Sequence, residues 1–141
     1  MDNETLYKAC DIISLHMPLL ESTRHFVNAE TIARMKDGVT IINCARGELM
    51  NIPDMIRGIE TQKIGALALD VFDKEDGIYH ENRRDDILSN RDMAYLRQFP
   101  NVIMTQHMAF YTDAAVQSMV FCGVEGLCDF AKTGHTATEL V

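Results

Sequence analysis

The sequence predicts an α/β protein built on a parallel β-sheet, and three observations indicate this fold. Short apolar runs that end in polar or charged residues occur at residues 10–19, 38–47, 64–73 and 101–106. Segments with helical periodicity separate these runs. A strand-helix alternation requires right-handed crossovers, so the strands lie parallel in one sheet. Because such runs are typical of strands covered on both faces, we expect both faces of the sheet to be buried.

Helix caps mark three of the expected helices. Asn28 is placed to cap a helix over residues 28–36, and Asn51 precedes Pro53, which is tolerated in a first turn. That second helix covers residues 51–63. A third, over residues 89–99, has Ser89 or Asn90 as its cap and lies within a polar, mostly acidic insertion at residues 73–100.

The last helix, residues 113–134, is expected to end at Gly134. Apolar residues recur along it at three- and four-residue steps, as on one face of a helix. This stripe must pack against something, and its members are Val116, Met119, Val120, Gly123, Leu127 and Phe130.

Composition excludes several classes of protein. The 141 residues, 47% of them hydrophobic, suit one globular domain or part of a larger one. A formal charge of -8 would repel a nucleic acid. No run reaches about 18 uncharged apolar residues, and the first residues are acidic, unlike a signal peptide. We therefore expect a soluble cytoplasmic protein that binds neither nucleic acid nor membranes.

Four cysteines lie at irregular spacings, with no C-x-x-C pair, at positions 10, 44, 122 and 128. Neither a disulfide framework nor a zinc ribbon is indicated, and we expect buried, reduced thiols. A metal site built from His16, Cys44 and His107 fits no known ligand spacing, so no metal is predicted.

Polar side chains follow each predicted strand, at the edge where open parallel sheets bind ligands. The first strand ends at His16-Met17-Pro18, and the second at Cys44-Ala45-Arg46-Gly47. Asp70 and the loop through Glu75 follow the third, and Gln106-His107 follow the fourth. One cation, two acids and one imidazole can thus converge over one crevice.

Arg46 and His107 are the two candidates with suitable chemistry. A guanidinium grips a carboxylate through two parallel hydrogen bonds, and Gly47 lets the backbone turn tightly and bring a ligand close. An imidazole moves protons near neutrality, although a histidine at a strand end is more often structural. Glu75 lies in an acidic run that would ordinarily be solvated, and only a pairing with His107 gives it a role. Buried Asp70 would cap a turn or meet a ligand.

Four motifs, "DIISLHMPLLEST", "IINCARGEL", "ALDVFDKE" and "PNVIMTQHMAFYT", together resemble the NAD-dependent D-isomer-specific 2-hydroxyacid dehydrogenases, most closely the D-lactate dehydrogenase branch. The resemblance implies the second half of a Rossmann-type doubly wound parallel sheet plus a C-terminal helix. Residues 1–108 would be the C-terminal half of the NAD-binding domain. Residues 109–141 would be the helical segment that in the family returns to the substrate domain.

The resemblance also implies roles for individual residues. Arg46 would bind and polarise a small 2-oxo acid such as pyruvate, and His107 would donate the proton as NADH delivers hydride. Glu75 would pair with His107 and keep it protonated for the reduction. Phe110 would wall the substrate site. Residues expected to line the NAD site are Met17, Pro18, Thr23, Cys44, Ala45, Arg46 and Asp70.

Two departures from the family pattern stand out. Gln106 replaces the usual proline before the catalytic histidine, which would change how rigidly His107 is presented. The sequence contains no Gly-x-Gly, so the G-x-G-x-x-G turn that holds the pyrophosphate is missing. We therefore expect a C-terminal fragment and a homo-oligomer. The alternative to a D-lactate dehydrogenase is a catalytically incompetent, self-associating piece of one.

Overall fold

The computed structural model describes residues 2–75, 77–79, 82 and 90–138. The chain divides into two compact units, Met1–His107 and Met108–Val141, which are treated separately below. Much of the predicted acidic insertion lies outside the described residues, and so does Ser89, the alternative helix cap.

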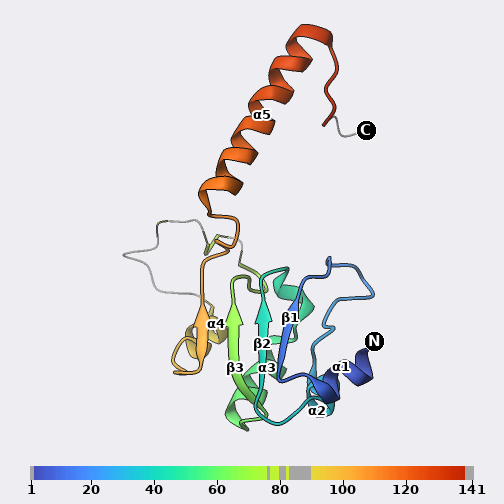
Figure 1. The fold of residues 1–141 in the computed structure, drawn as a ribbon. Coiled ribbons are helices and arrows are strands. Elements are labelled where there is room, and N and C mark those ends of the chain that lie inside the picture. Colours follow the sequence, from blue (N-terminus) through green and yellow to red (C-terminus); the bar gives the residue numbers. More distant parts are fainter. Residues whose placement is uncertain (1, 76, 80–81, 83–89, 139–141) are drawn as a thin grey trace. The chain divides into compact units, whose positions relative to one another are not determined.

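The first unit contains a four-stranded parallel sheet in the order β1-β2-β3-β4 (Figure 1). Its strands are β1 (Ile12–Leu15), β2 (Val39–Asn43), β3 (Ile64–Leu69) and β4 (Val102–Met104). The predicted parallel α/β architecture is confirmed. Since neighbouring strands are consecutive in the sequence, all four carboxyl ends lie along one edge in chain order.

Three predicted helices begin at the expected caps. Helices α2 (Ala29–Arg34), α3 (Ile52–Glu60) and α4 (Arg91–Leu96) follow β1, β2 and β3. The side chains of Asn28, Asn51 and Asn90 each accept a hydrogen bond from a backbone N–H in the first turn. These oxygens satisfy donors that a helix start leaves without intrahelical partners.

Helix α1 (Asn3–Ala9) was not predicted from the sequence. Asp2 caps it by accepting a 2.8 Å hydrogen bond from the Thr5 N–H. Tyr7 is buried and packs against Phe26, with ring centroids 6.3 Å apart. The segment is mostly polar, so its composition gave no sign that Tyr7 is buried and anchors the helix.

Within the first unit, helices cover only one face of the sheet, so for the described residues of this unit the expectation of burial on both faces is wrong. Along β1, Ile13 and Leu15 are buried, whereas Ile12 is 63% exposed. Ile103 of β4 is 66% exposed. The physical reason is that the helices contact one another in a single row, α1-α2-α3-α4, and form one layer. We call the other face, marked by Ile12 and Ile103, the open sheet face.

The hydrophobic core lies between the sheet and this helix layer. Alternate strand residues point into it, as expected for a pleated strand. Its fully buried members include Ile41, Leu67, Leu69, Met55 and Leu96. Asn43 continues the same alternation after Val39 and Ile41, so its polar side chain is also completely buried.

The second unit contains helix α5 (Asp113–Thr133). Gly134 adopts a left-handed conformation, and its N–H donates a 2.8 Å hydrogen bond to the Phe130 carbonyl, which confirms the predicted end. No residue of α5 is buried, and the stripe expected to pack stays exposed within its unit except for Val116, which is half-buried. By length and composition alone, α5 could cross a membrane. The criterion applied to the sequence, a run of about 18 uncharged apolar residues, is stricter and did not identify α5 as such a helix.

The expectation of buried thiols is also wrong. Cys44, Cys122 and Cys128 are exposed and Cys10 is half-buried, all four without a disulfide. Cys44 lies just beyond the end of β2, and the other two exposed thiols lie on α5, where nothing in the unit covers them.

Candidate active site

Main-chain hydrogen bonds join the ends of three neighbouring strands. The Asp70 N–H, just after β3, donates to the Asn43 carbonyl of β2 at 3.0 Å. The His107 N–H, after β4, donates to the Asp70 carbonyl at 2.7 Å. The loops that carry the predicted site residues are therefore fixed to one another by backbone groups.

Glu75 and His107, which the sequence analysis expected to pair, are in contact. A carboxylate oxygen of Glu75, Oε1, hydrogen-bonds Nδ1 of the His107 ring. The other oxygen, Oε2, accepts a 2.8 Å hydrogen bond from the Phe72 N–H. The two side chains are 21% and 32% exposed, so solvent screens this pair only partly. With Nδ1 facing the carboxylate, Nε2 is the nitrogen placed to exchange a proton with a substrate.

His107 has a left-handed backbone conformation, with φ of 54°, which residues other than glycine adopt infrequently. Two hydrogen bonds to β3 and its exit hold the chain in this form. The Thr105 N–H donates to the Leu69 carbonyl at 2.9 Å, and the His107 N–H donates to Asp70. Gln106 lies between these two anchored residues, and its effect on how rigidly His107 is presented stays a prediction.

Asp70 is buried, as its place after an apolar strand predicts, with 5% of its surface exposed. Its carboxylate accepts a hydrogen bond from the Thr105 hydroxyl at the end of β4. This bond offsets part of the cost of burying a charge and adds a side-chain link between β3 and β4.

Arg46 follows β2 and precedes a short 3-10 helix, η1 (Gly47–Leu49). Its side chain is exposed, and Nη1 donates a 2.8 Å hydrogen bond to the Ala45 carbonyl. The guanidinium therefore lies back along its own loop at the carboxyl edge of the sheet.

Gly47 has a different role from the one expected. Its φ is not positive, so no unusual turn requires glycine. A Cβ at this position would lie 2.1 Å from the Phe72 carbonyl carbon and 2.4 Å from the Asp73 nitrogen. Gly47 thus lets the loop after β3 pack against the Arg46 loop, which brings Glu75 and Arg46 onto adjacent segments.

A hollow of about 580 Å³ lies over the ends of β1 and β2. Predicted cofactor residues Met17, Pro18, Cys44, Ala45 and Arg46 all line it, together with His16 and Leu19. Thr23 and Asp70, the other two residues expected at the cofactor site, do not line it. Instead the Thr23 hydroxyl donates to the Pro18 carbonyl and accepts from the Leu20 N–H, both at 2.8 Å, and so shapes the wall.

These residues suit a flat, partly apolar cofactor group, as the expected NAD site requires. Met17, Pro18 and Ala45 offer apolar surface to a flat ring, and Arg46 brings a cation to the same hollow. The pyrophosphate cradle is not among them, since the sequence has no Gly-x-Gly turn.

Two residues near the site were not singled out from the sequence. The Asn43 side chain bonds both Ala45 and Arg46, and its place on the buried face of β2 was a usable signal. Tyr79 follows a turn in which its N–H donates to the Glu75 carbonyl at 3.1 Å. Burial, then the negative charges of Glu75 and Asp70, raise the pKa of Tyr79 to about 12, against an opposing effect of Arg97.

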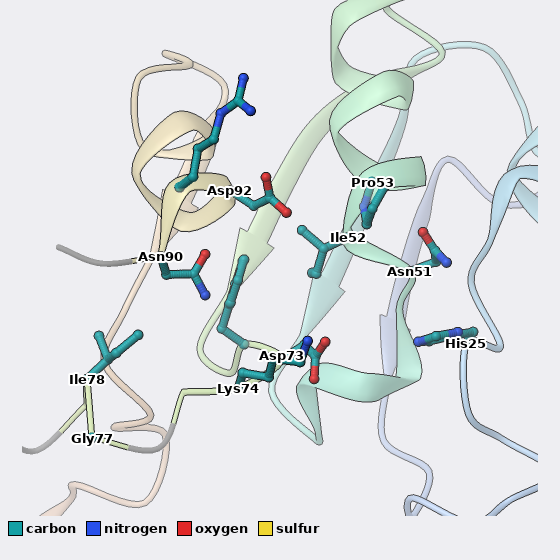
Figure 2. A pocket seen from close by; sticks show the side chains of 12 residues that line it. His25, Asn51, Ile52, Pro53, Asp73, Lys74, Gly77, Ile78, Asn90 and Asp92 are labelled. Atoms are coloured by element: carbon teal, nitrogen blue, oxygen red, sulfur yellow. The ribbon is translucent and has the colours of Figure 1, made fainter.

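A second hollow, of about 640 Å³, lies between the loop after β3 and the starts of α3 and α4 (Figure 2). His25, Asn51, Asp73 and Asp92 are among the residues that line it. None of the predicted site residues in the described part of the chain lines this hollow. It is therefore separate from the candidate active site.

Phe110 belongs to the second unit, where its ring meets that of Tyr111 edge to face, with centroids 6.2 Å apart. Its expected place as a wall of the substrate site stays a prediction. Among the residues that the structure describes, no group of three or more His, Cys, Asp or Glu is arranged to hold a metal ion.

A parallel sheet with a hollow and an acid-imidazole pair at its carboxyl edge defines a Rossmann-type α/β protein with an acid-base site. Residues 1–109 match the family model described as "D-isomer specific 2-hydroxyacid dehydrogenase, NAD binding domain". The chain belongs to this family.

Known relatives agree with this assignment. The chain is 43% identical over 138 residues to an aromatic 2-oxoacid reductase of Clostridium sporogenes, covering 98% of this chain and 42% of that protein. It is 35% identical to D-lactate dehydrogenase kk1H of Curvularia clavata, covering 100% and 40%. The chain thus spans less than half the length of these relatives.

Solved structures show the same fold. A D-lactate dehydrogenase from Treponema pallidum superposes with a TM-score of 0.94 at 32% identity, covering 100% of this chain and 43% of that one. The D-lactate dehydrogenase of Lactobacillus jensenii, solved with NAD+, gives 0.89 at 34% identity, covering 100% and 42%. The predicted Rossmann-type half-sheet with a C-terminal helix is confirmed.

Proposed function

We propose that this protein acts as an NAD-dependent D-2-hydroxyacid dehydrogenase that interconverts pyruvate, or a similar small 2-oxo acid, with the D-2-hydroxy acid. The hydrogen-bonded pair of Glu75 and His107 carries this proposal. An imidazole backed by a carboxylate, one loop away from an arginine, supplies what carbonyl reduction needs: a proton donor and an anion binder.

In the reduction, His107 acts as the general acid. Nε2–H donates its proton to the carbonyl oxygen of the 2-oxo acid, whose carbonyl carbon would receive the hydride that NADH supplies when bound. The Glu75 carboxylate stabilises the imidazolium before the transfer, and the neutral ring remains afterwards. In the reverse direction the same nitrogen takes the proton from the hydroxyl group.

Arg46 binds the substrate in this proposal. Its guanidinium presents a planar fork that matches a carboxylate, and its charge polarises the neighbouring carbonyl. The Ala45 carbonyl, which Nη1 contacts now, competes for the same donor. When the substrate binds, its carboxylate would replace the Ala45 carbonyl as the acceptor for Nη1.

Aromatic 2-oxo acids are a second class of candidate substrate. The relative at 43% identity is named an aromatic 2-oxoacid reductase, whereas others are named D-lactate dehydrogenases. Arg46 and His107 would treat both classes alike, because the carboxylate and the carbonyl are common to them. Comparing pyruvate with phenylpyruvate separates the two classes.

A steady-state assay tests the proposal. NADH consumption by the purified chain is measured with pyruvate and with phenylpyruvate, alongside the His107→Ala variant. Turnover that this substitution abolishes supports the proposal. Absence of turnover with either acid, in a folded chain, supports the alternative that the chain is catalytically incompetent by itself.

We also propose that the chain forms homo-oligomers. Two apolar surfaces support this: the exposed residues of α5, including Phe121, Leu127 and Phe130, and the open sheet face with Ile12 and Ile103. Exposed apolar surface of this extent favours association. A second copy of the chain would cover these residues.

A further inference from the structure

Asn43 is a buried polar residue at the end of β2, immediately before the Arg46 loop. Its exposed fraction is 0%. Its Nδ2 donates a 2.8 Å hydrogen bond to the Arg46 carbonyl, and its Oδ1 accepts a 3.0 Å hydrogen bond from the Ala45 N–H. One amide group therefore holds both sides of the peptide that leads into Arg46.

The backbone of Asn43 is fixed independently of these contacts. It pairs in register with Leu15 of β1 and Leu69 of β3. Its carbonyl also accepts the Asp70 N–H. The side chain thus projects from the carboxyl end of an interior strand and links that fixed backbone to an exposed loop.

A role in stability alone would need only that these buried polar atoms find partners. The partners they find, however, are the main-chain groups on either side of the Ala45-Arg46 peptide, and both residues line the hollow at the strand ends. An apolar residue at position 43 would fit the pattern of Val39 and Ile41 but would leave that peptide unheld.

We propose that Asn43 is a positioning residue that fixes the Arg46 loop for binding the carboxylate of a 2-oxo acid. The part concerning the 2-oxo acid rests on the proposed function. The part concerning the loop rests on the structure alone. Displacing a binding group by about 1 Å can cost about 100-fold in rate, so holding this peptide matters for activity.

Asn43→Asp is the sharpest variant, because it keeps the shape of the side chain. One oxygen still accepts the Ala45 N–H. The other replaces the donating nitrogen and faces the Arg46 carbonyl, which it repels when ionised. When protonated, the acid donates to that carbonyl and restores the contact. Nearby titratable groups are Arg46 and the Cys44 thiol on the same loop, Asp70 after β3 and His16 after β1, and the unmodified chain controls for them.

Asn28→Asp is a matched control. Asn28 makes the same kind of contacts elsewhere, accepting from the Glu30 and Thr31 N–H groups and donating to the His25 carbonyl at 2.9 Å. Asn28→Asp therefore also removes a donor to a backbone carbonyl, but in a loop that does not carry Arg46.

Two measurements on the purified chains test the proposal: NMR signals of the Ala45 and Arg46 amides across pH, and pyruvate affinity by titration. Asn43→Asp should shift these amides and weaken pyruvate binding about tenfold or more near neutral pH, with both effects reversing in acid. Asn28→Asp should do neither. Unchanged amides in Asn43→Asp, or equal changes in Asn28→Asp, would overturn the proposal.

Shifted amides with unaltered pyruvate affinity would overturn the link to substrate binding. If the unmodified chain does not bind pyruvate, the proposed function fails. The amide signals still decide in that case whether Asn43 holds the loop.

Discussion

The two carboxylate oxygens of Glu75 have different partners: Oε1 contacts Nδ1 of His107, and Oε2 accepts the Phe72 N–H. The Phe72 N–H therefore orients the Glu75 carboxylate independently of its contact with the imidazole. His107 in turn is anchored to Asp70 through its own N–H. The loop after β3 therefore fixes both members of the pair.

Glu75→Gln should lower kcat/KM for pyruvate reduction about 10- to 100-fold, a range seen when a partner that orients a functional histidine is removed. A glutamine keeps an oxygen for the Phe72 N–H but offers no charge to the imidazolium. Steady-state kinetics checks this, with nitrogen NMR of the His107 ring as the independent reading. Full activity with an unaltered ring signal would show that Glu75 has no catalytic effect.

Arg46→Lys should raise KM for the 2-oxo acid and lower kcat, because an ammonium cannot form two parallel hydrogen bonds to a carboxylate. We expect a loss in kcat/KM of about 100-fold, close to the contribution of a well-oriented contact. Arg57→Lys, which changes an exposed arginine of α3 that does not line this hollow, serves as the control. Unchanged kinetics with pyruvate would remove Arg46 from the substrate site.

Gly47→Ala should destabilise the first unit by about 3 kcal/mol, since the new Cβ would overlap the backbone of Phe72 and Asp73. Gly123→Ala is the matched control, because a Cβ there meets nothing within 4 Å. That control should favour the helix by up to about 1 kcal/mol. Urea unfolding measures both, and equal midpoints for Gly47→Ala and the parent would contradict the close packing of the two loops.

Because of Tyr79, the free energy of unfolding should fall in alkaline solution. Its pKa rises from the usual 10.0 to about 12 in the folded chain. Between these values the unfolded chain loses this proton first, so unfolding is increasingly favoured as pH rises; below pH 10.0 the contribution is fully present. Tyr79→Phe should reduce the slope of unfolding free energy against pH in that window. An identical slope in both proteins would refute the shift.

Leu127→Lys should weaken self-association. Leu127 is 73% exposed on α5, and a charge there would oppose burial against a second copy. Gln117→Lys is the control, since Gln117 is an exposed polar residue of the same helix. Light scattering coupled to size exclusion gives the mass of each. A monomeric parent chain at micromolar concentration would reject the oligomer, and binding to lipid vesicles would point to a membrane instead.

The parallel strands and the helix caps could be predicted from local sequence patterns, and the Glu75–His107 contact from the resemblance to the family, since these two residues lie 32 positions apart. Asn28, Asn51 and Gly134 occupy positions where few other residues serve, and the paired motifs fixed the acid and the imidazole.

Tertiary packing explains what could not be predicted. Nothing local shows that Gly47 faces the backbone of Phe72 rather than a ligand. Exposure of Ile12 and Ile103 depends on which helices cover the sheet, and an apolar strand has the same pattern with either face open. Tyr7 likewise anchors α1 through a contact with Phe26, a residue distant in the sequence.

The most direct test of the central claim measures the transfer of hydride from NADH to pyruvate and its dependence on His107. The purified chain is incubated with pyruvate and NADH deuterated at the transferred position, and the lactate is analysed for deuterium and handedness. We predict D-lactate carrying deuterium at carbon 2, with formation reduced about 100- to 10,000-fold in His107→Gln, the range for loss of a general acid. L-lactate would contradict the assignment as a D-2-hydroxyacid dehydrogenase, and deuterated lactate formed equally well by His107→Gln would contradict the assignment of His107 as the proton donor.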